Sequence, residues 1–149
     1  MELAEVVGAG PVALDTVAFI YFIEDHPRFV PLLEPLFVEA DRGRRTLVTS
    51  ALTLLEVLVV PYRVGDLPLA ARYEALLTRS RGVRLVDLQR TQLRVAAHLR
   101  ALHRVRTPDA LQLAAALSER CTAFVTNDRA LPAIEGLRVI QLEDWARQR

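Results

Sequence analysis

The sequence contains no lysine, because all 19 of its cationic residues are arginine. This absence excludes every chemistry that needs an ε-amine, including Schiff-base catalysis, the lysine of a phosphate-binding loop and the lysine of a phospho-receiver domain. The formal net charge is only +1. A strongly basic protein that coats nucleic acid regardless of its sequence is therefore also disfavoured.

Cysteine, glycine and proline are scarce. The single cysteine, Cys121, excludes an internal disulfide framework and a cysteine-based zinc site, and it predicts a reducing, cytoplasmic location. There are 6 glycines and 8 prolines among 149 residues, and 52% of the chain is apolar. These values exclude a disordered or collagen-like chain and predict one domain over residues 1–149.

Long hydrophobic runs are also missing. The most apolar stretch, Ala51–Val60, is interrupted by Glu56 and is too short to span a bilayer. The N-terminus carries Glu2 and Glu5 where a secretory signal carries cations. We therefore expect no membrane segment. The mean hydropathy of +0.21 predicts that some apolar surface is buried against another chain.

Short β-branched runs alternate with longer helical patterns, which is typical of an α/β fold with a parallel sheet and crossover helices. The expected strands are Val12–Leu14, Leu47–Thr49, Val83–Val86, Ala123–Thr126 and Arg138–Ile140. The expected helices are Thr16–Ile23, Pro31–Arg42, Leu52–Val60, Pro68–Thr78, Gln89–His103 and Pro108–Arg120, with short helices after Asp128 and Glu143.

Two of these helices have informative faces. Thr16–Ile23 is apolar almost all round, so we expect it to be covered on more than one side. Gln89–His103 has two faces. We expect its apolar side to carry Leu88, Val95, Leu99 and Leu102, and its polar side to carry Arg90, Arg94, Arg100 and Arg104. The arginine side is either an ordinary solvated face or a ridge that contacts phosphates, with Arg90, Arg94 and Arg104 as the candidate phosphate-contacting residues.

Two aspartates directly follow expected strands. Asp15 follows Val12–Leu14, and Asp128 closes Thr126-Asn127-Asp128 after another strand. Binding sites in parallel sheets lie beyond the carboxyl ends of the strands, so both residues are candidates for a site there. Each also has a structural interpretation, since Asp15 suits a helix N-cap and Asp128 suits a turn or an N-cap.

Two further acids belong to helices. Asp109 lies in the first turn of the helix that begins near Thr107, where an acid also favours the helix dipole. This helix runs antiparallel to the strand that follows it, which brings Asp109 to the same sheet edge. Glu56 interrupts a nearly apolar helix, and a partly buried carboxylate is costly unless it is paired or binds metal.

Together the four acids predict a metal site. Carboxylate oxygens without nearby histidine or cysteine suit a hard cation, Mg²⁺ or Mn²⁺. Such a site activates water and neutralises charge on a phosphodiester that is being cleaved. The candidate catalytic and metal-binding residues are therefore Asp15, Glu56, Asp109 and Asp128, and the candidate supporting residues are Thr16, Ser50, Thr126 and Asn127.

The segments around these acids resemble the PIN-domain nucleases and, more narrowly, the VapC toxins of bacterial toxin–antitoxin pairs. The resemblance covers about Val12 to Ile140 and rests on Val12-Ala-Leu-Asp15-Thr16, Thr49-Ser-Ala-Leu-Thr-Leu-Leu-Glu56-Val57, Arg106-Thr-Pro-Asp109-Ala-Leu-Gln-Leu-Ala-Ala-Ala116 and Val125-Thr-Asn-Asp128. Where many relatives have a further acid after the Thr-Asn-Asp, this sequence has Arg129-Ala130. A second metal site is therefore in doubt.

The resemblance implies an α/β/α sandwich with a five-stranded parallel sheet of order 3-2-1-4-5. It also implies a metal-dependent endoribonuclease that is usually dimeric, cleaves tRNA or rRNA, and is neutralised by a cognate VapB-type antitoxin. Asp15, Glu56, Asp109 and Asp128 match the acidic positions of the family.

Two alternatives stay open at this stage. A phosphatase or phospho-receiver also needs acids at strand ends, but the missing lysine and the absence of a second acid at Val17 disfavour it. The other alternative is a degenerate, non-catalytic PIN domain that acts as a binding module. The presence of all four acids argues against it.

Overall fold

The structure is a computed structural model that describes residues 2–147. Its centre is a five-stranded parallel sheet with the order β3-β2-β1-β4-β5. This confirms the expected α/β class and strand order. The strands are β1 (Val12–Leu14), β2 (Leu47–Ser50), β3 (Val83–Val86), β4 (Ala123–Thr126) and β5 (Arg138–Gln141).

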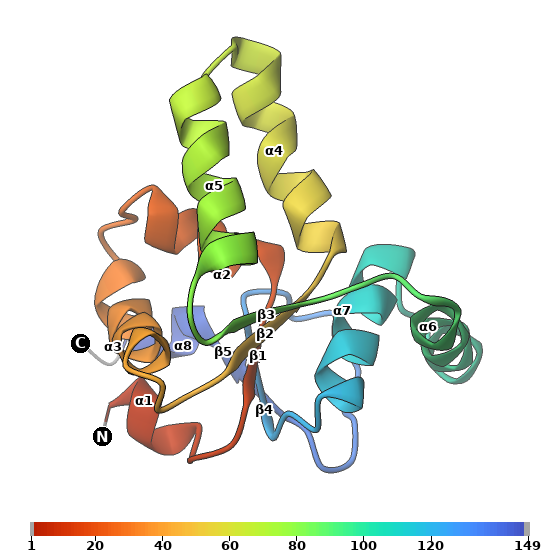
Figure 1. Cartoon of the computed structure of the whole chain (residues 1–149). Helices are drawn as coiled ribbons and strands as arrows, with labels where there is room; N and C mark the ends of the chain where they lie inside the picture. Colours follow the sequence, from red (N-terminus) through yellow and green to blue (C-terminus); the bar gives the residue numbers. More distant parts are fainter. Residues whose placement is uncertain (1, 148–149) are drawn as a thin grey trace.

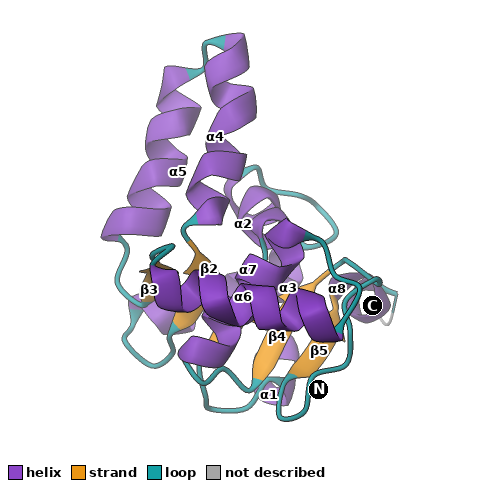
Figure 2. Cartoon of the chain, turned by 90° about the vertical axis from the view of Figure 1, so that its right-hand side faces the viewer, coloured by secondary structure: helices purple, strands orange, loops and turns teal. Residues whose placement is uncertain are grey.

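Eight helices surround this sheet in the described part of the chain. They are α1 (Leu3–Val6), α2 (Thr16–Ile23), α3 (Val30–Asp41), α4 (Leu52–Val64), α5 (Leu67–Arg79), α6 (Arg90–Leu102), α7 (Thr107–Ser118) and α8 (Leu142–Ala146). Figure 1 shows α1, α3 and α8 on one side of the sheet and α6 and α7 on the other. Helices α4 and α5 form an antiparallel arm that projects beyond the sheet edge (Figures 1 and 2).

The sheet separates two hydrophobic cores. Along β1, Val12 and Leu14 face the core formed with α1, α2 and α3, whereas Ala13 faces the core formed with α6 and α7. The central strands are buried on both faces, and they therefore read as short continuous apolar runs rather than alternating ones.

Helix α2 is covered within the same chain, as its apolar composition requires. The ring of Phe22 stacks on Phe37 of α3 with 3.8 Å between centroids, and Tyr21 stacks on Phe29 at 4.5 Å. Helix α3 therefore supplies the second cover in addition to the sheet.

Two local predictions were wrong. No helix follows Asp128, because its Oδ1 accepts a hydrogen bond from the backbone N–H of Ala130 at 2.9 Å and closes a turn instead. Helix α4 continues through Pro61 to Val64 rather than ending at Val60. A short N-terminal helix, α1, was not expected.

The buried face of α6 also differs from the expected one. Gln92, Ala96 and Leu99 are buried, while Leu88 and Leu102 are 42% and 77% exposed. Helix α6 packs on α7, and residues spaced three or four apart on its inner face meet that helix. The two leucines lie outside this contact. No helix among residues 2–147 is long and apolar enough to cross a membrane.

Candidate functional site

An open cavity of about 500 Å³ lies at the carboxyl edge of the sheet, and all four predicted acids line it. Asp15 follows β1, Glu56 lies on α4, Asp109 is in the first turn of α7, and Asp128 follows β4. Each acid is half-buried. The parallel topology thus brings together residues that are up to 113 positions apart in the sequence.

Asp15 has a structural task as well as a place in the cavity. Its Oδ1 accepts a hydrogen bond from the N–H of Ala18 at 3.3 Å, which caps α2. Its Oδ2 accepts a hydrogen bond from the hydroxyl of Thr126, and the oxygen of that hydroxyl accepts from the N–H of Asp128 at 2.9 Å. Thr126 therefore links the two strand-end aspartates.

Glu56 is held from the neighbouring helix. Its Oε1 accepts a hydrogen bond from the hydroxyl of Thr16 at 2.6 Å. No arginine pairs with Glu56 among the residues that the structure describes. The carboxylate is thus oriented by a neutral donor and faces the cavity without a cationic partner.

The acids also act on one another. Burial raises the pKa of Asp15 from 3.8 to about 6, and the negative charges of Asp128 and Asp109 add to that shift. Hydrogen bonds from Thr126 and Ala18 oppose it. Burial and the charge of Asp128 likewise raise the pKa of Asp109, while Arg106 acts in the opposite direction. The cavity is therefore a place where added positive charge is favoured.

The supporting residues differ in where they lie. Thr16 and Asn127 line the cavity, whereas Ser50 is buried and its hydroxyl accepts from the N–H of Leu52. Asn127 joins elements of the fold, since its Oδ1 accepts from the N–H of Glu143 at 2.8 Å and its Nδ2 donates to Tyr21 at 3.3 Å.

Two polar residues of the cavity wall, Gln112 and Arg106, were not predicted from the sequence. Gln112 is 5% exposed on α7, one turn after Asp109. The sequence could have indicated Gln112, because it interrupts an otherwise apolar helical stretch, as Glu56 does in α4. Arg106 lies at the start of the same helix, with its Nε 3.8 Å from Asp109 Oδ2.

The candidate RNA-binding arginines on and after α6 lie outside this wall. Arg90, Arg94 and Arg104 are exposed, and none lines the cavity. Arg100 comes closer, because its Nη1 donates to the Thr107 hydroxyl at 3.0 Å, at the first residue of α7. Its partner Thr107 directly precedes Pro108 and Asp109, which line the cavity together with Arg106.

The donors fit a hard divalent cation by chemical type, because the four carboxylates and the side chains of Thr16, Gln112 and Asn127 in the wall all offer oxygen. The carboxylates line the walls of the cavity and do not form a closed cage. Within residues 2–147, no three His, Cys, Asp or Glu side chains are gathered as a ready-made metal cluster.

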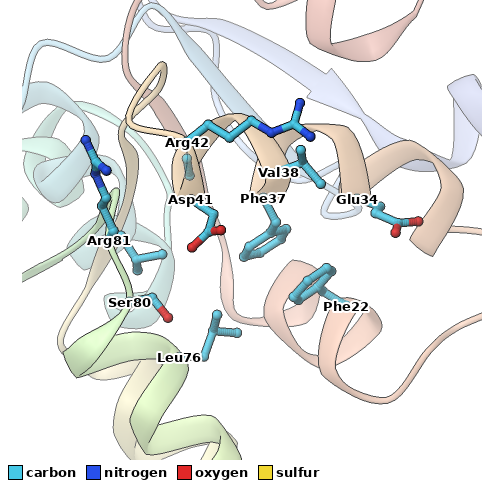
Figure 3. A pocket seen from close by; sticks show the side chains of 11 residues that line it. Phe22, Glu34, Phe37, Val38, Asp41, Arg42, Leu76, Ser80 and Arg81 are labelled. Carbon is cyan, nitrogen blue, oxygen red and sulfur yellow. The ribbon is translucent and has the colours of Figure 1, made fainter.

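A second cavity, of about 430 Å³, lies between α3, α5 and the end of α2. Figure 3 shows the rings of Phe22 and Phe37 side by side, with Leu76 and Asp41 facing the same space. Its floor is apolar and its rim carries both signs of charge, including Glu34 and Arg42. This composition suits an apolar side chain better than a metal ion.

Comparison with known proteins decides the family. The family model described as "PIN domain" matches residues 12–137, which include all four acids of the cavity. The chain belongs to the PIN-domain family. No curated protein matches the sequence.

Solved structures share the fold of this PIN domain at low sequence identity. A toxin–antitoxin complex from Klebsiella pneumoniae is 19% identical with a TM-score of 0.67, covering 88% of this chain and 97% of that one. DNA-bound VapBC from Salmonella typhimurium is 21% identical with a TM-score of 0.67, covering 89% and 98%. FitAcB from Neisseria gonorrhoeae is 18% identical with a TM-score of 0.59, covering 89% and 98%.

Proposed function

We propose that this PIN domain, as one domain over residues 1–149, is an endoribonuclease toxin that depends on Mg²⁺ or Mn²⁺. In this proposal it hydrolyses phosphodiester bonds in structured RNA, tRNA or rRNA, in the cytoplasm and is neutralised by a cognate VapB-type antitoxin. The observation that carries the proposal is the convergence of four half-buried carboxylates from four elements on one open cavity. Solved structures of similar fold are toxin–antitoxin complexes, which supports the choice of function.

Asp15, Glu56, Asp109 and Asp128 are the residues that would hold the metal ion in this proposal. A bound divalent ion supplies charge neutralisation at the phosphodiester and a water of lowered pKa. The protein's own part is orientation. Thr126 fixes Asp15 through its hydroxyl, and Thr16 fixes Glu56 in the same way. Arg106 at the rim is placed to meet a phosphate that enters the cavity.

The test is a cleavage assay on total RNA with Mg²⁺, with Mn²⁺ and with a chelator. We expect discrete cleavage products with either metal and none with the chelator, and mapping of the new 5′ ends identifies the RNA that is cut. Binding of RNA without cleavage under every metal condition would support the alternative, a degenerate, non-catalytic PIN domain that acts as a binding module.

The arginines of α6 give a separate prediction about RNA binding. Replacing Arg90 and Arg94 together by alanine should weaken RNA binding with little effect on stability, because both side chains are exposed. If both contact phosphates, the slope of log affinity against log salt shrinks by about one unit per lost contact. An unchanged slope assigns these residues to an ordinary solvated face.

Replacement of Arg100 and Arg106 is the matched comparison. Arg90 precedes Arg100 by ten residues, which places it about 15 Å further along the helix from the cavity rim. We therefore expect replacement of Arg100 and Arg106 to lower both RNA affinity and cleavage, and replacement of Arg90 and Arg94 to lower RNA affinity alone.

For the antitoxin, we propose a segment with apolar anchors against α2 and an arginine that reaches the acids. Phe22, Phe37 and Leu76 offer the apolar site. Phe22 follows Asp15 by seven residues, so the two contacts lie about 10 Å apart along α2. Antitoxin binding measured at rising Mg²⁺ should weaken, and Asp109→Asn should reduce it. If neither Mg²⁺ nor Asp109→Asn changes the affinity for the antitoxin, only the apolar contact of this proposal stands.

We also propose that the chain forms a homodimer, and the α4–α5 arm supports this. The arm exposes a series of large apolar side chains, which are Leu55, Val59, Val60, Tyr62, Val64 and Leu67. Apolar surface of this kind marks a protein interface more often than a solvated face. Light scattering of the purified chain, with and without antitoxin, measures the oligomeric state, and a monomer at all concentrations contradicts the dimer.

A further inference from the structure

Gln112 makes a buried hydrogen-bond network directly behind the acids. It lies on α7 three residues after Asp109, and its amide group reaches the end of β2 and the first turns of α2 and α4. Glutamine is rarely this deeply buried unless its amide is satisfied by partners. The network thus joins all the elements that carry Asp15, Glu56 and Asp109.

The backbone of β2 fixes the orientation of the Gln112 amide. The N–H of Ser50 lies 3.1 Å from Gln112 Oε1, and a backbone N–H can only donate. Oε1 is therefore the oxygen, and it also accepts from the hydroxyl of Thr49 at 3.2 Å. The amide nitrogen must then face Thr53 at 2.8 Å and Thr16 at 3.5 Å.

The hydrogen bonds of this network lead from Gln112 to Glu56. A carboxylate can only accept, so the hydroxyl hydrogen of Thr16 is committed to Glu56 Oε1. The Thr16 oxygen must then accept, and its donor is the Gln112 amide at 3.5 Å. The Thr53 hydroxyl cannot be that donor, because its single hydrogen goes to Thr49 at 2.7 Å, and the hydrogen of Thr49 goes to Gln112 Oε1. Among the described residues, no hydrogen bond reaches Glu56 Oε2, so this oxygen is available to the cavity.

We propose that Gln112 is a positioning residue that fixes Glu56, through Thr16, in the geometry with which the site binds a divalent metal. The proposal rests on the proposed metal-dependent function. Gln112 itself does not ligate the ion; it sets where the Thr16 hydroxyl points, and hence where the Glu56 carboxylate lies. Supporting contacts of this kind commonly change metal affinity by about 10–100-fold.

The first test is Mn²⁺ binding, measured by electron paramagnetic resonance without any RNA. Gln112→Met keeps the length of the side chain and removes its donors and acceptor, and we expect it to weaken Mn²⁺ binding by about tenfold. Gln92→Met is the matched control, because Gln92 is similarly buried at 7% exposure but lies on α6, outside the cavity wall. We expect wild-type Mn²⁺ affinity for this control.

A double-mutant cycle separates positioning from general destabilisation. In a Glu56→Gln background, Gln112→Met should cause no further loss of Mn²⁺ affinity, because the residue through which it acts has already been changed. An equal loss in both backgrounds, or wild-type affinity in Gln112→Met, overturns the proposal.

Thr53 supplies a second route if Gln112→Met does not fold. Thr53→Val keeps the shape of the side chain but removes the hydroxyl oxygen that accepts from the Gln112 amide and orients it toward Thr16, whereas Thr53→Ser keeps this oxygen. We expect Thr53→Val to lose Mn²⁺ affinity and Thr53→Ser to retain it. Equal affinities in the two variants contradict the proposal. Failure of the wild-type chain to bind Mn²⁺ overturns the proposed function and this inference together, whereas wild-type binding with unaffected variants overturns only the inference.

Discussion

Replacing Asp109 by asparagine is expected to abolish metal-dependent RNA cleavage, with a loss of at least about a thousandfold, while the chain still folds. The substitution removes a carboxylate charge from the cavity at nearly constant shape. It also relieves the repulsion from Asp128 that raises the pKa of Asp109. The lost interaction with the helix dipole costs only about 0.3–1 kcal/mol, so the fold should persist. Asp15→Asn should abolish cleavage in the same way.

The measurement is the rate of cleavage at low Mg²⁺, with circular dichroism to check that each variant is folded. Asp66→Asn is the matched control, because Asp66 also lies at a helix start, where its Oδ1 accepts from the N–H of Leu69. It is remote from the cavity wall, and its cleavage rate should equal that of the wild type. Wild-type rates in both Asp109→Asn and Asp15→Asn would refute the assignment of these acids.

The second large effect is on the free energy of unfolding, which Asp15→Asn should raise although it abolishes cleavage. The pKa of Asp15 is about 6 in the folded chain, above its ordinary value of 3.8. The folded state therefore binds this proton more tightly than the unfolded state. Stability is lost as the pH rises from about 4 to about 6, and the cost stays constant above that range.

Asp15→Asn removes this cost and keeps an N-cap of similar quality, but its amide nitrogen no longer accepts the hydrogen bond from Thr126. We expect the free energy of unfolding at pH 7.5 to rise by about 2 kcal/mol, somewhat less than the full shift implies, because the carboxyl group reaches an open cavity. At pH 4 the gain should nearly vanish. Millimolar Mg²⁺ should shrink the gain at pH 7.5, because a bound cation stabilises only the wild-type site.

Denaturant unfolding at several pH values measures this effect. Asp144→Asn serves as a control with the opposite expectation, because the hydrogen bond from Arg129 lowers the pKa of Asp144 and removing that pair does not stabilise the fold. An Asp15→Asn variant that is less stable than the wild type, by an amount independent of pH, would contradict the argument.

The sheet and the placement of the acids were predictable because they depend on local signals and one topological rule. The three central strands, β1, β2 and β4, are short runs buried on both faces, and parallel strands end at one edge. Asp15 and Asp128 follow strands, so the rule places them together without knowledge of packing. Glu56 was visible because it interrupts an apolar helix.

The missed features depend on tertiary contacts that no local pattern encodes. Gln112 was hidden because its role comes from Ser50, Thr53 and Thr16, which lie 59 to 96 positions away. The buried face of α6 is decided by its packing on α7, which leaves Leu102 exposed. Helix α4 passes Pro61 because α5 packs along it and stabilises the projecting arm.

The central claim is that the four carboxylates hold a divalent ion, and anomalous X-ray diffraction from crystals grown with Mn²⁺ tests it most directly. We expect an anomalous peak inside the cavity, within coordination distance of carboxylate oxygens from Asp15, Glu56, Asp109 or Asp128, and loss of that peak in Asp15→Asn. A cavity without a peak at Mn²⁺ concentrations that support RNA cleavage, or a peak that persists unchanged in Asp15→Asn, would contradict it.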